Sequence, residues 1–232
     1  MIAPAFDAVL FDLDGTLVDS FDDIAASANH ALVTVGRTAL PVPLIKSYVG
    51  EGIHVLMRRA LGTDDPELIE RAVAAWRPHY EAHCLDRTLP YGGVVPLLQD
   101  LAAAGVKLGV VSNKLESLTV ATVNGLGWKS LFGAVVGGDT TPQRKPDPSP
   151  LRHAAGILGI TGKRILFVGD TANDLGAARA AGWPSCAVTW GQIPEEELRR
   201  LQPDFLVRHP REIANLVLPR FTPQARNKTD AA

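Results

Sequence analysis

A short apolar run near the start of the chain ends abruptly in polar residues, and this junction limits the folds that the chain can adopt. Residues 8–11 are apolar and are followed directly by Asp12-Leu13-Asp14-Gly15-Thr16. A continuous run of this kind is typical of a strand that is buried on both faces of a parallel sheet. Open α/β sheets bind ligands at the carboxyl ends of their strands. The sequence therefore predicts an α/β fold with Asp12 and Asp14 at a ligand-binding edge.

Two carboxylates this close together require either a proton or a cation between them. Two unit charges 4 Å apart repel by about 4 kcal/mol at an effective dielectric constant of 20. Either arrangement is compatible with catalysis. With a shared proton, the ionised aspartate can attack phosphorus while its protonated neighbour donates the proton to the leaving oxygen. Gly15 and Thr16 add a close backbone approach and a hydroxyl. The structural alternative is an Asx-type turn, which Asp-Gly commonly forms after a strand.

Two later predicted strands end in the same way. Residues 106–111 lead into Ser112-Asn113-Lys114, whose side chains can hold a phosphoryl oxygen, and residues 164–169 lead into Asp170 and then Asp174. Carboxylates are hard oxygen ligands of the kind that Mg²⁺ prefers. Structural alternatives exist for each: Ser112 and Asp170 are also suitable helix N-caps, and an acid in a first helical turn is favoured by the helix dipole. On local evidence alone, N-capping is the more common role for Ser112.

A proline-rich loop between these strands carries one candidate cation. Lys145 lies between Arg144 and Pro146 in the irregular segment 137–148. Because the prolines stiffen the loop, Lys145 can present a fixed positive charge to a carboxylate that carries a phosphoryl group. Most lysines in loops instead face water.

Residues 19–90 show helical rather than strand periodicity. Helices are predicted at 22–35, at 53–61 and from residue 65 onwards. The segment is too long for a simple connection between strands. We therefore expect an inserted all-helical domain.

The inserted segment contains one glycine-rich loop that leads into a helix, Tyr48-Val49-Gly50-Glu51-Gly52-Ile53. Such a loop can present backbone N–H groups to an anion at the start of the helix. Gly50, Glu51 and Gly52 are therefore candidate substrate-binding residues. Alternatively, the two glycines only permit a tight turn.

Composition narrows the range of partners. The formal net charge is −2, and paired arginines occur only as Arg58-Arg59 and Arg199-Arg200, so no basic surface for nucleic acid is expected. The two cysteines lack the spacing of a zinc site and fit a reduced cytosol. The start of the chain is unlike a signal peptide, and no apolar run approaches the roughly 18 residues of a membrane span. We expect a cytoplasmic protein with no membrane partner.

The polar residues, taken in order, resemble the motifs of the haloacid dehalogenase-like phosphatases. Each of these residues has a structural explanation by itself, but no single structural explanation accounts for all of them in this order. The resemblance implies a Rossmann-like parallel-sheet core at residues 1–18 and 91–221, with a helical cap at 19–90. Residues 222–232 are polar and are expected to form a disordered tail. The motif residues are Asp12-x-Asp14-Gly15-Thr16, Ser112, Lys145, and Asp170 with Asp174.

The resemblance also implies a role for each residue. Asp12 would be the nucleophile and Asp14 the general acid and base. The phosphoryl group would be bound by Thr16, Ser112 and Asn113, and Lys145 would offset its charge. The implied cofactor is Mg²⁺, held by Asp12, the backbone carbonyl of Asp14 and Asp170, with Asp174 in support. Dehalogenases of the family lack the second aspartate, so Asp14 favours phosphate chemistry.

Within the family, the cap loop, Gly137-Gly138-Asp139 and residues 144–151 resemble the phosphoglycolate phosphatases. This implies a small phosphorylated metabolite as the substrate, with 2-phosphoglycolate as the expected one, and the loop from Gly50 to Ile53 as the group that binds its carboxylate. Three alternatives remain: a sugar-phosphate phosphatase, a phosphomutase on the same scaffold, and a non-catalytic phosphate-binding regulatory domain.

Overall fold

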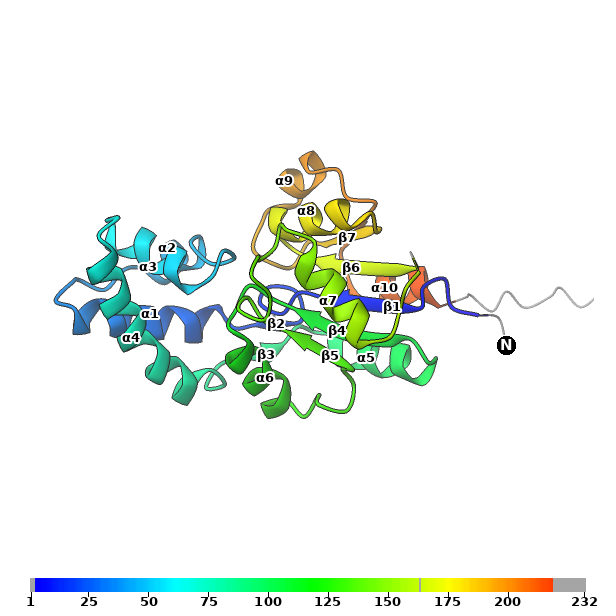
Figure 1. Ribbon diagram of the computed structural model, residues 1–232, viewed down its shortest axis with the longest axis horizontal. Helices are drawn as coiled ribbons and strands as arrows, with labels where there is room; N and C mark the ends of the chain where they lie inside the picture. Colours follow the sequence, from blue (N-terminus) through cyan, green and yellow to red (C-terminus); the bar gives the residue numbers. More distant parts are fainter. Residues whose placement is uncertain (1–2, 163, 219–232) are drawn as a thin grey trace, which may run out of the picture.

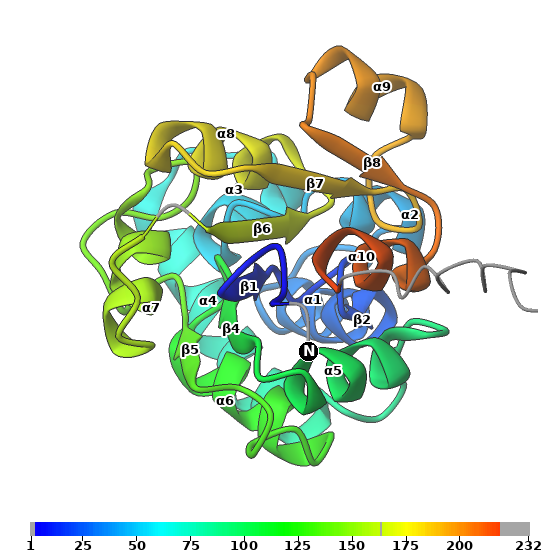
Figure 2. The same cartoon turned by 90° about the vertical axis from the view of Figure 1, so that its right-hand side faces the viewer.

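The computed structural model describes residues 3–162 and 164–218, and a six-stranded sheet forms its core (Figures 1 and 2). The strand order is β5-β4-β1-β6-β7-β8, and every neighbouring pair is parallel. The predicted α/β fold with a parallel sheet is therefore confirmed. The expected tail at 222–232 and the last residues of the predicted core, 219–221, lie outside the described residues. The strands are β1 (Ala8–Phe11), β4 (Lys107–Val111), β5 (Ala134–Val136), β6 (Ile165–Gly169), β7 (Ser185–Val188) and β8 (Phe205–Val207).

The register of the three central strands brings the polar junctions together. Strand β1 lies between β4 and β6, and Phe11 is opposite Val110 on one side and Val168 on the other. The three strands therefore end at nearly the same level. The residues that follow them, which include Asp12 and Ser112, emerge along one edge of the sheet.

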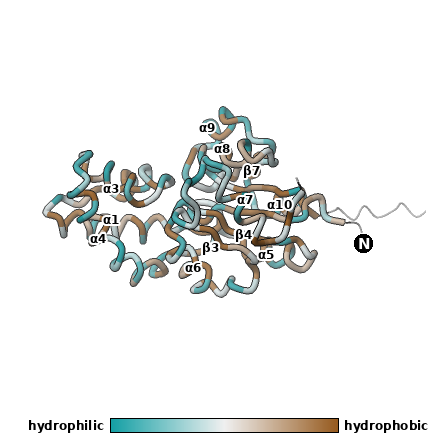
Figure 3. The backbone as a smooth tube through the Cα atoms, viewed as in Figure 1, coloured by the Kyte–Doolittle hydropathy of each residue, from teal (hydrophilic) through white to brown (hydrophobic). Residues whose placement is uncertain are grey.

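Helices cover both faces of the sheet, which explains the continuous apolar run of β1. Val9 and Phe11 pack in one cluster with α5 (Val94–Ala103) and α10 (Pro210–Val217), whereas Ala8 and Leu10 pack with α7 (Ser149–Ile157) and α8 (Ala172–Ala181). Figure 3 shows the resulting apolar centre of the core. The remaining helices of the core are α6 (Glu116–Gly125) and α9 (Glu195–Arg200).

Helix α7 is an addition to the predicted elements. It follows the proline-rich loop directly, with Pro148 as its N-cap and Pro150 in its first turn. Prolines suit the first turn of a helix, where the missing N–H has no intrahelical partner. The same prolines indicate an irregular loop when only the sequence is read.

Four helices, which we call the cap, are inserted between two very short strands. The strands β2 (Val18–Asp19) and β3 (Leu89–Pro90) pair antiparallel at the two ends of the insertion. The sequence pattern indicates no strand here, because two residues are too few to show a period. In Figure 1 the cap lies beyond the carboxyl ends of the core strands. Its helices are α1 (Phe21–Thr34), α2 (Val42–Lys46), α3 (Ile53–Leu61) and α4 (Pro66–His83).

The cap has its own apolar cluster, and this cluster extends onto the core. Buried residues such as Ala28, Met57 and Trp76 form it, and Leu115 and Leu118 join it from the start of α6. The cap is therefore docked on the core by apolar contact. Among the described residues, no helix combines the length and the apolar character required to span a membrane.

A buried carboxylate joins the two chain segments that connect the core to the cap. Asp23, in the first turn of α1, is 3% exposed. Its carboxylate accepts hydrogen bonds from the backbone N–H groups of Arg87 and Thr88, and from the Thr88 hydroxyl at 2.7 Å. Both donors lie on the segment that returns to the core. Asp23 thus fixes the outgoing chain to the returning one.

We expect Asp23→Ala to lower the free energy of unfolding, because it leaves buried donors unpaired at a cost of about 1–3 kcal/mol each. Urea denaturation measures the change. Asp22→Ala is the matched control: Asp22 is an exposed neighbour in the same turn, where substitutions usually change stability by about 0.5 kcal/mol or less. Equal effects of the two substitutions would contradict the role assigned to Asp23.

Candidate active site

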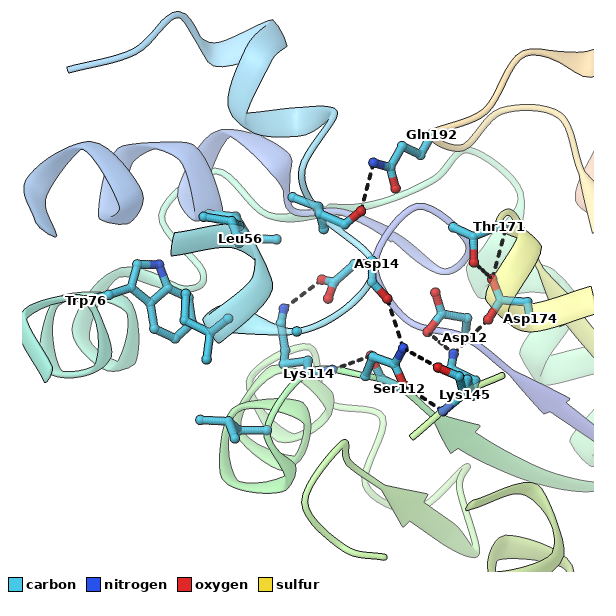
Figure 4. Close-up of a pocket in the computed structure, with 17 residues that line it drawn as sticks. Asp12, Asp14, Leu56, Trp76, Ser112, Lys114, Lys145, Thr171, Asp174 and Gln192 are labelled. Carbon is cyan, nitrogen blue, oxygen red and sulfur yellow. Dashed lines mark hydrogen bonds and ion pairs between the residues drawn. The ribbon is translucent and has the colours of Figure 1, made fainter. Parts of the chain in front are cut away.

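A small cavity of about 60 Å³ lies between the carboxyl edge of the sheet and the cap (Figure 4). The core contributes polar and charged side chains to its wall, whereas the cap contributes mostly apolar ones. The core residues that line it are Asp12, Asp14, Ser112, Asn113, Lys114, Leu115, Lys145, Thr171, Asp174 and Gln192. The cap residues are Ile24, Val49, Gly50, Gly52, Ile53, Leu56 and Trp76.

Lys145 is the centre of the charged cluster. Its Nζ lies 2.8 Å from Asp12 Oδ1 and 2.7 Å from Asp174 Oδ1, and it donates to the carbonyl oxygen of Val111 at 2.7 Å. Asn113 holds the backbone on both sides of Lys145: its Oδ1 accepts from the Lys145 N–H and its Nδ2 donates to the Lys145 carbonyl. The predicted proximity of Lys145 to Asp12 is therefore found, and a side-chain amide fixes the loop.

Three buried carboxylates lie close together here, and two of them, Asp12 and Asp174, contact the Lys145 ammonium group. Ligand oxygens of Asp12, Asp170 and Asp174 all lie within 4.8 Å of one another. Burial raises the pKa of Asp12 to about 7, although the nearby ammonium of Lys145 opposes the change. Burial also raises the pKa of Asp170, and the carboxylates of Asp174 and Asp12 add to the effect. Three carboxylates against one ammonium leave two negative charges unbalanced. A divalent cation with a preference for oxygen ligands fits this donor set.

Thr16 orients Asp170 instead of lining the cavity. Its hydroxyl donates to Asp170 Oδ1 at 2.9 Å, and the backbone N–H of Gln192 donates to Oδ2 at 2.7 Å. Thr16 is fully buried and absent from the cavity wall. The Thr16 hydroxyl is therefore bonded to a carboxylate in this structure, and its binding of the phosphoryl group stays a prediction.

Asp174 combines a role in the cluster with a role in helix capping. Its Oδ1 faces Lys145, while its Oδ2 accepts from the backbone N–H and the hydroxyl of Thr171. Thr171 is the N-cap of α8, so the structural alternative for Asp174 also applies. For Ser112 it does not, because α6 begins only at Glu116. Ser112 lines the cavity, and its binding of the phosphoryl group stays a prediction.

Asp14 lies on the cap side of the cavity and pairs with a second lysine. Lys114 Nζ is 2.6 Å from Asp14 Oδ1, and the Ser20 hydroxyl donates to the same oxygen. Lys114 also donates to the hydroxyl of Tyr80 on α4, at 2.7 Å. Lys114 is one of the polar residues predicted to follow the strand, but its pairing with Asp14 and Tyr80 has no signal in the sequence. For Tyr80, no local signal was present, because only the docking of the cap brings it here.

Three amide side chains of the core hold the glycine loop of the cap. Nδ2 atoms of Asn113 and Asn173 donate to the Gly50 carbonyl oxygen at 2.9 and 3.3 Å. Gln192 Nε2 donates to the carbonyl oxygens of Val49 and Lys46. The amide of Asn113 thus joins the Lys145 loop to the cap, and its phosphoryl-binding role stays a prediction.

Gly50 and Gly52 line the cavity, but Glu51 does not. The Glu51 carboxylate faces away and forms an exposed ion pair with Arg59, 2.5 Å away. Of the three candidate residues of the loop, only the two glycines therefore lie on the cavity wall in this structure. Gly52 is the N-cap of α3, with no side-chain hydrogen bond to the N–H groups of the first turn.

The haloacid dehalogenase-like hydrolase family model matches residues 9–188. The chain belongs to this family. Among the relatives of this hydrolase, the phosphoglycolate phosphatase of Neisseria gonorrhoeae is 42% identical over 189 residues, which are 79% of this chain and 80% of the relative. That of Thiobacillus denitrificans is 36% identical over 215 residues, which are 90% and 95% of the two chains. The family resemblance predicted from the motifs is thereby confirmed.

Solved structures agree with the fold. The crystal structure of a predicted phosphoglycolate phosphatase from Haemophilus somnus matches this hydrolase with a TM-score of 0.85 at 30% identity, and the match covers 91% of this chain and 98% of the other. A putative phosphoglycolate phosphatase from Lactobacillus delbrueckii matches with a TM-score of 0.84 at 26% identity, covering 92% and 99% of the two chains.

Substitution of Gly15 tests whether the reaction requires the close approach of the backbone to Asp170. Its φ is +88°, and a Cβ at this position would lie 2.4 Å from Asp170 Oδ2. We expect Gly15→Ala to displace that carboxylate and to reduce turnover of p-nitrophenyl phosphate by about 100-fold, as misplacements of about 1 Å can.

Gly36→Ala is the control for backbone strain. Gly36 has a similar φ of +77°, but nothing lies within 4 Å of a Cβ placed there. It should retain activity at a comparable cost in stability. Similar activity losses in both variants, with folding verified by circular dichroism, would exclude the collision with Asp170 as the cause.

Proposed function

We propose that this hydrolase is a Mg²⁺-dependent phosphatase that converts 2-phosphoglycolate to glycolate and phosphate. The observation that carries the proposal is the placement of Asp12 and Asp14 on the wall of one small cavity, each beside its own lysine. The names of the two relatives described above support the substrate.

Asp12 serves as the nucleophile in this proposal. A carboxylate oxygen of Asp12 forms a bond to phosphorus while the bond to the ester oxygen breaks, which gives an aspartyl phosphate. Asp14 protonates the departing alkoxide. It then removes a proton from water, which attacks the phosphorus and releases phosphate and free Asp12. Lys145 offsets the charge of the phosphoryl group, and the Ser112 hydroxyl is within the same cavity.

The carboxylates of Asp12 and Asp170, with the backbone carbonyl of Asp14, would hold the Mg²⁺. The metal would supply positive charge to the phosphoryl oxygens. Asp174 supports this set through Lys145 and through the backbone N–H of Asp170, to which its Oδ2 is bonded. Thr16 and Gln192 fix the orientation of the Asp170 carboxylate.

The cavity favours a compact ester over a bulky one. Its volume of about 60 Å³ and its closure by the cap leave room for a short leaving group. The start of α3, at Gly52, offers backbone N–H groups toward an anion. A small phosphorylated metabolite with a second anionic group matches both features.

Substrate comparison tests the proposal directly. We expect kcat/KM for 2-phosphoglycolate to exceed that for sugar phosphates, glycerol phosphates and nucleotides, because its leaving group is short enough for the small cavity and carries one carboxylate. Phosphate release should require Mg²⁺ and stop on addition of EDTA. A sugar phosphate that reacts faster would refute the substrate, and an isomerised sugar phosphate without free phosphate would indicate a mutase. Metal-independent turnover would refute the cofactor.

Substitution of the two aspartates should separate their roles. Asp12→Asn removes the nucleophile and should abolish turnover, whereas Asp14→Asn should impair proton transfer, by about 10²–10⁴-fold. Rapid quenching followed by mass spectrometry of the Asp14→Asn protein should find a phosphoryl adduct on Asp12. An adduct on Asp14 in the unmodified protein would reverse the assignment.

A further inference from the structure

The two lysines of the cavity differ in how many of their hydrogen-bond donors are used. An ammonium group has three N–H donors. Those of Lys145 are all engaged, by Asp12, by Asp174 and by the Val111 carbonyl. Lys114 donates to Asp14 and Tyr80 and to no third acceptor within residues 3–162 and 164–218. One donor of a buried ammonium group is therefore left for a molecule in the cavity.

Lys114 also lies on the side of the cavity where the leaving group must extend. Figure 4 shows it between Asp14 and Trp76, whereas Lys145 lies on the other side, beside Asp12. The phosphoryl group belongs next to Asp12, and the ester oxygen next to Asp14, which protonates it. The next atoms of the substrate therefore approach Lys114, whose Nζ is 2.6 Å from Asp14.

The surroundings of Lys114 make its charge effective. Its side chain is 5% exposed, and apolar cap residues such as Ile24 and Leu56 form the neighbouring wall. Attraction between opposite charges is stronger in such a poorly solvated place than in water. Trp76 lines the same cavity, and its buried Nε1 has no hydrogen-bond partner among the described residues.

We propose that Lys114 binds the second anion of the substrate, the carboxylate one carbon beyond the ester oxygen, and thereby determines the preference for 2-phosphoglycolate. The inference rests on the proposed function for the phosphoryl end. The Tyr80 hydroxyl accepts from Lys114 and so holds the ammonium group in place from the cap side. Since Tyr80 belongs to the cap, the position of the ammonium group depends on the docked cap.

The test compares two esters that differ only in the carboxylate. Ethyl phosphate has a methyl group where 2-phosphoglycolate has its carboxylate. In Lys114→Met, we expect the ratio of kcat/KM for 2-phosphoglycolate to that for ethyl phosphate to fall by about 10- to 100-fold, as for loss of a hydrogen bond between charged groups. Most of the fall should be in KM for 2-phosphoglycolate. Lys114→Arg, which keeps the charge, should recover part of the ratio.

The exposed Lys129 provides the matched control, and Lys129→Met should leave the ratio unchanged. Equal losses for both esters in Lys114→Met would overturn the inference, because they would show that Lys114 only positions Asp14. A ratio that survives unchanged in Lys114→Met would overturn it as well. If the unmodified protein shows no preference for 2-phosphoglycolate over ethyl phosphate, the result refutes the proposed substrate, and with it the role of Lys114 in selecting that substrate. If Lys114→Met does not fold, Lys114→Gln, which removes the charge but keeps a polar end, replaces it, and an unchanged ratio in that variant is the contradicting result.

Discussion

The burial of one ammonium group between carboxylates is the interaction on which the site depends. Lys145 is almost wholly buried, and so is Asp174. Ions in such a place are stable only when they are paired and hydrogen-bonded. Each N–H of Lys145 has an acceptor, and Asn113 fixes the backbone around it. The parallel sheet makes this possible, because the level ends of β1, β4 and β6 supply Asp12, the Val111 carbonyl and the acids after Gly169 from neighbouring strands.

The position of the cap and the geometry of the acid cluster are linked through Gln192. Its backbone N–H donates to the Asp170 carboxylate, and its side chain donates to the carbonyl oxygens of the cap loop. Asn113 makes an equivalent link, since it contacts both Gly50 and Lys145. Opening of the cap would break the bonds from Gln192 and Asn113 to the cap loop. Their bonds to Asp170 and Lys145 lie within the core and would remain. Docking of the cap therefore restrains the same two side chains that hold the charged residues.

The sequence predicts those parts of the site that depend on strand ends. An apolar run followed by acid shows where β1 stops, and Lys145 is restricted by its neighbouring prolines. The contacts that the sequence does not predict are those between residues distant in the chain. Thr16 and Asn113 carry the polar atoms expected of phosphate ligands, and their side chains bond residues 154 and 32 positions away. Lys114 meets Tyr80 only because the cap docks on the core. Helix α7 is not predicted because the prolines at its start indicate a loop. Strands β2 and β3 are not predicted because two residues are too few to show an alternating pattern.

The antiparallel pair of β2 and β3 has a consequence for how such a protein can diversify. Val18 lies opposite Pro90, so the chain leaves the core and re-enters it at neighbouring positions. A short turn could join these positions without altering the order of the six core strands. Insertions of other lengths and shapes are therefore compatible with an unchanged sheet and an unchanged Asp12. Related proteins with the same core can therefore differ in the inserted domain and in the substrates that it admits, while the residues at the strand ends stay the same.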